Sequence, residues 1–186
     1  MFMEHSLRPL EKNDLIKVLE WRNDLRIRQN MFNERKISLV EHLEWYHNTC
    51  QDSSIRNLIY TVDQIATGFI SFSKMDQKNG TCFWGFYVGN ETAPKGIGYI
   101  MGYLGIDYAI NQLKMRKING EVLSNNIQSI KFHERLGFVR EGLFSEHYLK
   151  NGNYQDVIRF ALFQDQWNLL KDKIKEEINR NGFNFC

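Results

Sequence analysis

The sequence feature that most constrains the fold is a glycine-containing loop between a predicted strand and a predicted helix. Residues 81–88 are apolar and aromatic, as in a β-strand, and an apolar helical pattern runs from Ile97 to about Leu113. The loop between them contains Lys95-Gly96-Ile97-Gly98. Glycines let backbone N–H groups approach a ligand, and the first helical turn adds unpaired donors and the positive end of its dipole. The pattern predicts either an anion site for a phosphate group or a simple tight turn before a helix.

The other predicted elements complete a single domain that spans residues 1–186. Asn79-Gly80 and Asn151-Gly152 are typical of β-hairpin turns. A strand that follows the long helix requires one parallel crossover in a sheet that is otherwise antiparallel. We therefore expect an α/β or α+β fold with a mixed, mostly antiparallel sheet flanked by helices. The predicted strands are 6–10, 57–62, 68–72, 81–88, 117–123, 138–149 and 154–163.

Helices are predicted at both ends of this sheet. Asn13 is expected to cap the first helix, and Ser38 and Glu41 form a capping box for the second. The apolar stripe of the second helix is expected to contain Leu39, Leu43 and Tyr46. The core covers about 5–163, and an amphipathic helix at about 164–181 follows it, with Trp167, Leu170, Ile174 and Ile178 on one face.

Composition excludes several classes of function. The formal net charge is only +2 over 186 residues, so no global basic field favours nucleic acid. The cysteines Cys50, Cys82 and Cys186 form no C-x-x-C pair, so neither a metal site nor a disulfide framework is expected. The N-terminus lacks the layout of a signal peptide, and the longest strongly apolar run is too short to span a bilayer. We expect a cytoplasmic protein with no nucleic-acid or membrane partner.

One segment is locally basic. Residues 22–36 contain only two acidic side chains, Asp24 and Glu34, but five basic ones: Arg22, Arg26, Arg28, Arg35 and Lys36. This pattern is typical of a solvated helix face, and it also suits a docking surface for an anionic substrate.

A second motif identifies a family. Residues 126–138, with the sequence NIQSIKFHERLGF, resemble the N-x-x-A-x-x-[FL]-Y-E-K-L-G-F signature of the GNAT superfamily of N-acetyltransferases. The loop from Lys95 to Gly98 resembles the loop with which these enzymes bind the pyrophosphate of acetyl-CoA, and the two motifs have the family's spacing. The resemblance implies that acetyl-CoA is the cosubstrate and that an amine is acetylated by direct attack on the thioester. A catalytically idle CoA-binding module is the alternative from another class.

The resemblance also implies positions for acetyl-CoA. The strand ending Phe86-Tyr87-Val88 would pair with the pantetheine arm, and the N–H near Val88 would stabilise the oxyanion. The pyrophosphate would lie on residues 95–99, which are Lys95, Gly96, Ile97, Gly98 and Tyr99. Ala93 stands where the family often has Gln or Arg, so anchoring should depend on backbone donors. The second motif would supply Asn126, Ser129, Phe132 and Arg135, the last near the 3′-phosphate. Asn126 also suits a helix cap, Ser129 a helix filler and Arg135 a solvated charge.

His133 occupies the position at which the family usually has a tyrosine that protonates the CoA thiolate. An imidazolium would donate a proton readily but be only partly populated at neutral pH, and a neutral imidazole can still hydrogen-bond sulfur. We therefore expect His133 to be catalytic, with a packed helix histidine as the alternative.

The N-terminal half suggests the acceptor. Residues 19–23 and 37–43 are similar to the GNAT subgroup that acetylates UDP-4-amino-4,6-dideoxy-N-acetyl-β-L-altrosamine in pseudaminic acid biosynthesis. By this resemblance the substrate is a nucleotide sugar bound by Arg22, Met31, Phe32, His42, Ser73 and Tyr87, and His42, Ser73, Glu146 or His147 would contact or deprotonate its amine. Arg22 could instead form an ion pair with Glu20 or Asp24. The Trp21-Arg22-Asn23 start also resembles ribosomal-protein alanine N-acetyltransferases, which act on a protein N-terminus. A homodimer is compatible with either.

Overall fold

A computed structural model describes residues 3–180 of the chain. One seven-stranded sheet has the order β1-β2-β3-β4-β5-β7-β6. All neighbouring strands are antiparallel except β4 and β5, which are parallel, so the predicted mixed sheet with one crossover is confirmed. The strands are β1 (His5–Pro9), β2 (Arg56–Val62), β3 (Ile65–Asp76), β4 (Thr81–Val88), β5 (Lys117–Leu123), β6 (Val139–Lys150) and β7 (Asn153–Phe163).

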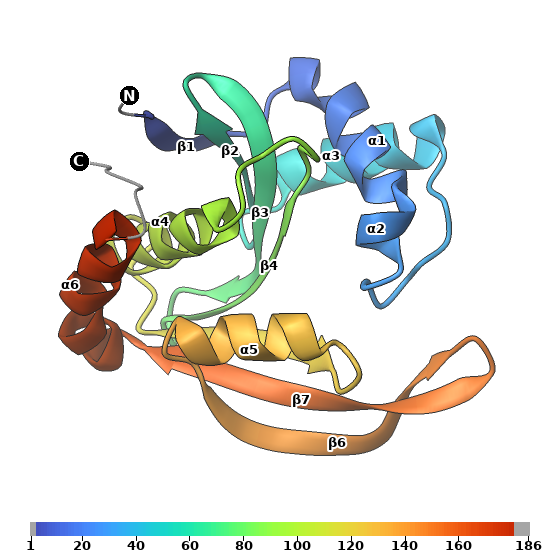
Figure 1. Ribbon diagram of the computed structural model, residues 1–186. Coiled ribbons are helices and arrows are strands. Elements are labelled where there is room, and N and C mark those ends of the chain that lie inside the picture. Colours follow the sequence, from blue (N-terminus) through green and yellow to red (C-terminus); the bar gives the residue numbers. More distant parts are fainter. Residues whose placement is uncertain (1–2, 181–186) are drawn as a thin grey trace.

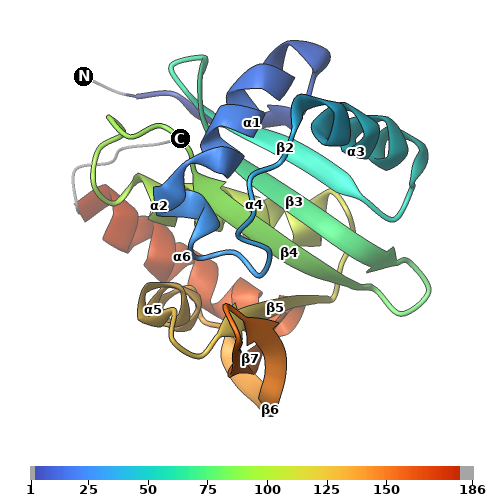
Figure 2. The same ribbon diagram turned by 90° about the vertical axis from the view of Figure 1, so that its right-hand side faces the viewer.

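Helices cover both faces of the sheet. On one face lie α1 (Leu15–Asn23), α2 (Leu25–Arg28) and α3 (Leu39–Gln51), and on the other lies α4 (Ile97–Asn111) (Figures 1 and 2). Helix α6 (Gln164–Arg180) packs beside α4, while α5 (Ile127–Arg135) lies near the place where β4 and β5 meet (Figure 1). No helix in the described part of the chain is both long enough and apolar enough to cross a bilayer.

Two apolar clusters hold these layers together. The larger one lies around α4 and includes residues of β2–β5, β7 and α6, such as Ile100, Phe160 and Trp167, each 0% exposed. The smaller one joins α1 and α2 to β2 and β3, with Val18 and Phe69 among its members. Because Trp167 is fully buried in the larger cluster, α6 is part of the core rather than an addition to it.

Local sequence patterns predicted two turns and two helix caps, and three of these four predictions are confirmed. The hairpin turns at residues 79–80 and 151–152 are present, with positive φ at Gly80, Asn151 and Gly152. The Ser38–Glu41 capping box also forms. The cap at Asn13 was wrong, because Asn13 lies inside a short 3₁₀ helix (Lys12–Asp14) and α1 begins only at Leu15.

The predicted apolar stripe of α3 was correct at Tyr46, which packs against the smaller cluster, and wrong at the two leucines. Leu39 and Leu43 are 44% and 46% exposed, whereas His42 is buried and Trp45 packs against the smaller cluster. The helix therefore turns its aromatic side chains, and not its leucines, toward the sheet.

Candidate active site

The two parallel strands in the middle of the sheet separate. Strands β4 and β5 pair only at Thr81–Lys117, Cys82–Ile118 and Phe83–Asn119. Beyond these pairs, residues 84–88 of β4 pair with β3 alone, and residues 120–123 of β5 pair with β7 alone. The edge of β4 that faces this gap can therefore pair with an extended, amide-bearing ligand as an added strand would.

The glycine loop meets the same gap. Gly96 adopts φ +95° and precedes the first residue of α4, where the Ile97 N–H is bonded to the Pro94 carbonyl at 3.3 Å. A Cβ added to Gly98 would lie 3.4 Å from Val88 Cγ2 and 3.9 Å from the Phe132 ring. The start of α4, the end of β4 and α5 thus converge around Gly98.

This arrangement fits acetyl-CoA in its main features. The structure places Phe86, Tyr87 and Val88 on the free stretch of β4, and Gly98, at the start of α4, beside Val88 and Phe132. Phe132 packs on Phe86 with ring centroids 4.7 Å apart. Arg26 donates to the Val88 and Gly89 carbonyls at 3.2 and 2.9 Å, which fixes the end of β4 to α2. The oxyanion role of the Val88 N–H stays a prediction.

Three other residues assigned to acetyl-CoA have partners in the protein. Asn126 caps α5 through a bond from the Ser129 N–H to its Oδ1 at 3.0 Å, so the cap alternative is confirmed. The Tyr99 N–H is bonded to the Gly96 carbonyl at 2.9 Å. Arg135 forms an ion pair with Glu177 of α6 and lies 4.0 Å above the Tyr99 ring, and the Tyr99 hydroxyl donates to Glu177 at 3.1 Å. Contacts of Asn126, Ser129 and Arg135 with acetyl-CoA stay predictions.

The surroundings of His133 favour a structural role over the catalytic role expected for it. Its Nε2 accepts a hydrogen bond from Trp84 Nε1 at 3.2 Å, and its Nδ1 donates to the Ser129 carbonyl at 2.8 Å. The ring is 2% exposed and stacks on Phe160. Burial lowers the pKa of His133 to about 4. A neutral ring with both nitrogens engaged has no free proton to give a thiolate, which favours the alternative of a packed helix histidine.

A cavity of about 400 Å³ lies on the α1–α3 side of β4. It contains Arg22, Met31, His42 and Tyr87, four of the six residues expected to bind the acceptor. Because Phe86 and Gly85 also line it, the cavity reaches the free stretch of β4 where the thioester is expected. The other lining residues are Val18, Arg35, Ile37, Glu41, Trp45, Phe69 and Ser71. We call this cavity the acceptor pocket.

Its electrostatics depend on Arg22. The only carboxylate in the lining, Glu41, forms an ion pair with Arg35 at 2.6 Å, and the hydrogen bond from Arg35 lowers the pKa of Glu41 to about 2. Arg22 Nη2 donates to the Asn33 carbonyl, but its Nη1 is buried with no hydrogen-bond partner among the described residues. Burial lowers the pKa of Arg22, and the nearby charges of Arg28 and Arg35 lower it further. The ion pair with Glu20 or Asp24 does not form, since Asp24 pairs with Arg26 instead.

His42 also lines the acceptor pocket and has one unpaired nitrogen. The side chain is 4% exposed and stacks on Trp45 with ring centroids 5.0 Å apart. Burial lowers the pKa of His42, against a smaller opposing effect from a hydrogen bond to the Leu15 backbone. Its Nε2 is buried and has no partner in the described part of the protein. The neutral ring can therefore accept a proton or a hydrogen bond from an amine in the pocket.

Two expected acceptor residues do not line the pocket. Phe32 packs edge-on against Tyr148 of β6, with centroids 5.0 Å apart. Ser73 lies two positions beyond Ser71, which lines the pocket from the same face of β3. Glu146 and His147 lie exposed on β6, outside the lining.

The sequence interpretation missed much of the pocket. Arg35 belongs to the basic segment, which was the only signal for it, and Glu41 was assigned only a capping role. Trp45 and Phe69 reach the pocket through the orientation of α3 and β3, which no motif indicates.

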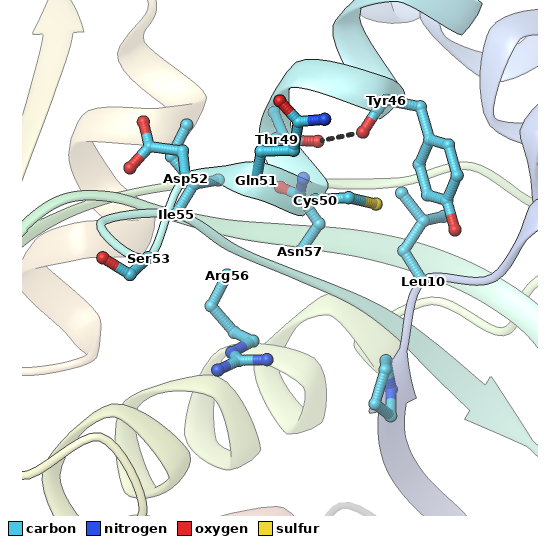
Figure 3. Close-up of a pocket in the computed structure, with 11 residues that line it drawn as sticks. Leu10, Tyr46, Thr49, Cys50, Gln51, Asp52, Ser53, Ile55, Arg56 and Asn57 are labelled. Carbon is cyan, nitrogen blue, oxygen red and sulfur yellow. Dashed lines mark hydrogen bonds between the residues drawn. The ribbon is translucent and has the colours of Figure 1, made fainter.

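A second cavity, of about 340 Å³, lies at the C-terminal end of α3 (Figure 3). It is lined by ends of β1, β2 and α3, including Leu10, Thr49, Cys50, Asp52 and Arg56. None of its residues was assigned to a site, and it does not include β4. Within residues 3–180, no three His, Cys, Asp or Glu side chains gather as a metal site would require.

Comparisons with known proteins agree with this geometry. Residues 7–158 match the acetyltransferase (GNAT) domain family. The spermidine N(1)-acetyltransferase of Escherichia coli (strain K12) is 27% identical over 162 residues, 87% of this chain and 87% of that protein. Acetyltransferase PseH of Campylobacter jejuni (strain 81-176) is 28% identical over 130 residues, 70% of this chain and 80% of that protein. The crystal structure of Vibrio cholerae spermidine N-acetyltransferase with CoA and spermine matches with a TM-score of 0.83 and 26% identity, covering 88% of this chain and 98% of that one.

Proposed function

The chain belongs to the GNAT acetyltransferase family, and we propose that it acetylates the amine of an anionic small molecule, a UDP-linked amino sugar. It is an acetyl-CoA-dependent N-acetyltransferase, as its family and its relatives show. The UDP-4-amino-4,6-dideoxy-N-acetyl-β-L-altrosamine of pseudaminic acid biosynthesis is the specific acceptor that the N-terminal sequence suggests.

The charge of the acceptor pocket carries this proposal. Arg35 and Glu41 neutralise each other, so the uncompensated charge in the lining is the Arg22 guanidinium with its unpaired Nη1. A buried donor without a partner costs about 1–3 kcal/mol, which a bound phosphate oxygen would recover. Guanidinium groups suit diphosphates because they donate in a planar fork.

The same charge argues against two other acceptors. Relatives of this chain are named for spermidine, a polycation, which would meet Arg22 and Arg35 with only one carboxylate that is already paired. A protein N-terminus also carries a positive charge, and the ribosomal-protein alternative has no additional acidic group in this pocket to support it. Both acceptors are therefore included in the assay described below.

Acetyl-CoA supplies the reactive acetyl thioester when it is bound. The residues of β4 and of the loop at 95–98 would hold and orient it, with Gly98 leaving the space that it needs. His42 would accept the amine proton at Nε2, because burial keeps its ring neutral and leaves that nitrogen free. Aromatic side chains that line the pocket, Trp45 and Phe69 among them, would shield the acceptor amine from water.

The test is CoA release from acetyl-CoA with UDP-linked 4-amino sugars, spermidine and an N-terminal alanine peptide as acceptors. We expect turnover with the amino sugars, and Arg22→Met should raise the KM for the sugar at least tenfold while changing the KM for acetyl-CoA less than twofold. Turnover with spermidine or the peptide alone would contradict the proposal.

The role of His42 has its own measurement. His42→Gln should lower kcat about 10²-fold, the lower end of general-base contributions. In the wild type, kcat at saturating acceptor should begin to fall only below pH 6.5, since burial lowers the pKa of His42. A His42→Gln variant with an unchanged rate would rule the base out.

A further inference from the structure

Lys150 is a buried lysine outside the acceptor pocket. It is the last residue of β6, at the tip of the β6–β7 hairpin, and is 7% exposed. Its Nζ donates to the Gln29 carbonyl at 2.6 Å and to the Met31 carbonyl at 3.0 Å, and lies 3.4 Å from Glu34 Oε2. Lysines are rarely buried without such partners, and all three partners belong to the segment 29–34 that follows α2.

Two further contacts join the same parts of the chain. Phe32 packs edge-on against Tyr148, and Asn151 hydrogen-bonds the Glu34 carboxylate, which lowers the pKa of Glu34. The hairpin extends beneath α2 to reach this segment (Figure 1). A stretch of about four residues at the hairpin tip thus holds a loop that lies more than 100 positions earlier in the sequence.

The segment 29–34 contributes to the acceptor pocket in two ways. The Met31 side chain lines the pocket, and the Asn33 carbonyl accepts the hydrogen bond that orients the Arg22 guanidinium. Lys150 itself is absent from the lining. Any effect of Lys150 on the acceptor must therefore pass through this segment.

We propose that Lys150 is a positioning residue that fixes the segment 29–34, and through it Met31 and Arg22, for binding of the acceptor. The ammonium group has three donors, which match two carbonyls and one carboxylate. The effect of Lys150 on acceptor binding rests on the proposed function. The contacts between the hairpin tip and the segment 29–34 do not depend on it.

The test compares Lys150→Met, which keeps the length of the stem but removes the donors, with Lys150→Arg, which restores charge and donors. Lys78→Met, at an exposed lysine in the β3–β4 turn, is the matched control. Amide hydrogen exchange measures how firmly Lys150 holds the segment 29–34. Calorimetric titration with UDP tests the acceptor pocket, and titration with CoA tests the acetyl-CoA site.

We expect exchange in residues 29–34 to be at least tenfold faster in Lys150→Met and unchanged in Lys78→Met. The Kd for UDP should rise at least fivefold in Lys150→Met, while the Kd for CoA changes less than twofold, and Lys150→Arg should recover most of the UDP affinity. Unchanged exchange in the segment, or an equal loss of affinity for UDP and CoA, would overturn the proposal.

The outcome is separable from that of the proposed function. If the wild type fails to bind UDP, the nucleotide-sugar acceptor is wrong, and the KM of the amine found in the acceptor panel replaces the Kd for UDP in the same comparison. If Lys150→Met does not fold, Tyr148→Leu removes the ring contact alone and should speed exchange in the same segment. If exchange in residues 29–34 of Tyr148→Leu equals that of the wild type, the hairpin tip does not hold this segment, and the proposal fails.

Discussion

At the scale of single residues, burial decides which histidine can take part in chemistry. His133 lies where the family signature has a tyrosine, but it donates to a helix carbonyl and accepts from Trp84. His42 comes from a part of the sequence without a catalytic motif, yet it lines the acceptor pocket and its Nε2 has no partner among the described residues. The partners of a ring, more than its position in a motif, therefore determine its role.

The buried state of His133 predicts a pH-dependent stability. Its pKa is about 4 in the folded protein and near 6.5 in the unfolded chain, so the unfolded state binds more protons between these values. The stabilisation is complete above pH 6.5 and is lost as the pH falls toward 4, about 3 kcal/mol in total. His133→Phe should remove this dependence while keeping kcat at pH 8 within about threefold of the wild type.

Urea denaturation at pH 7 and pH 5 measures this effect. The wild type should lose about 2 kcal/mol more than His133→Phe between the two pH values, because the other histidines are common to both proteins. The variant should start about 1–3 kcal/mol less stable, since it leaves the Trp84 N–H unpaired. A hundredfold loss of kcat in a folded variant would instead support a catalytic role for His133.

At the scale of elements, the strand–loop–helix unit could be predicted because its signals are local. Strand residues 81–88, the glycines at 96 and 98 and the apolar helix after them are adjacent in the sequence, and the structure has all three. The separation of β4 from β5 could be expected only through the family resemblance, since it depends on pairing across more than 30 residues. The burial of His133 depends on Trp84 of β4 and Phe160 of β7, which are distant in the sequence. No local pattern could therefore predict it.

Gly98 provides the test of this unit. An alanine Cβ would make ordinary contacts with Val88 and Phe132 but would take up space between the end of β4 and α5, where acetyl-CoA is expected. We expect Gly98→Ala to keep or slightly raise stability, because alanine is favoured over glycine in helices by about 0.5–1 kcal/mol. The Kd for CoA should nevertheless rise at least tenfold in a calorimetric titration. Gly142→Ala, on β6 with open space around it, is the control, and equal CoA affinity in the two variants would contradict this placement of the cofactor.

At the scale of the molecule, distant segments complete the two halves of the site. The hairpin tip holds the segment 29–34 beside the acceptor pocket, and α6 ties Arg135 of α5 and Tyr99 of α4 together through Glu177. These contacts join residues more than 40 positions apart, and neither partner has a sequence signal for the other. The location of the site could therefore be predicted from the sequence, but the contacts that organise it could not.

The burial of α6 leads to a prediction for the whole chain. Trp167 is 0% exposed, packs on Tyr103 of α4 with ring centroids 5.2 Å apart, and belongs to the same cluster as Ile100 and Phe160. Trp167→Ala should therefore lower the free energy of unfolding by about 3–5 kcal/mol. Because α4 and the sheet share this cluster, the circular dichroism signal and CoA binding should be lost together in one urea transition. Its midpoint should lie below that of the wild type. Leu169→Ala, at an 84% exposed position of the same helix, should leave the midpoint almost unchanged. Two separate transitions, with CoA binding surviving the first, would show instead that residues 5–163 fold without α6.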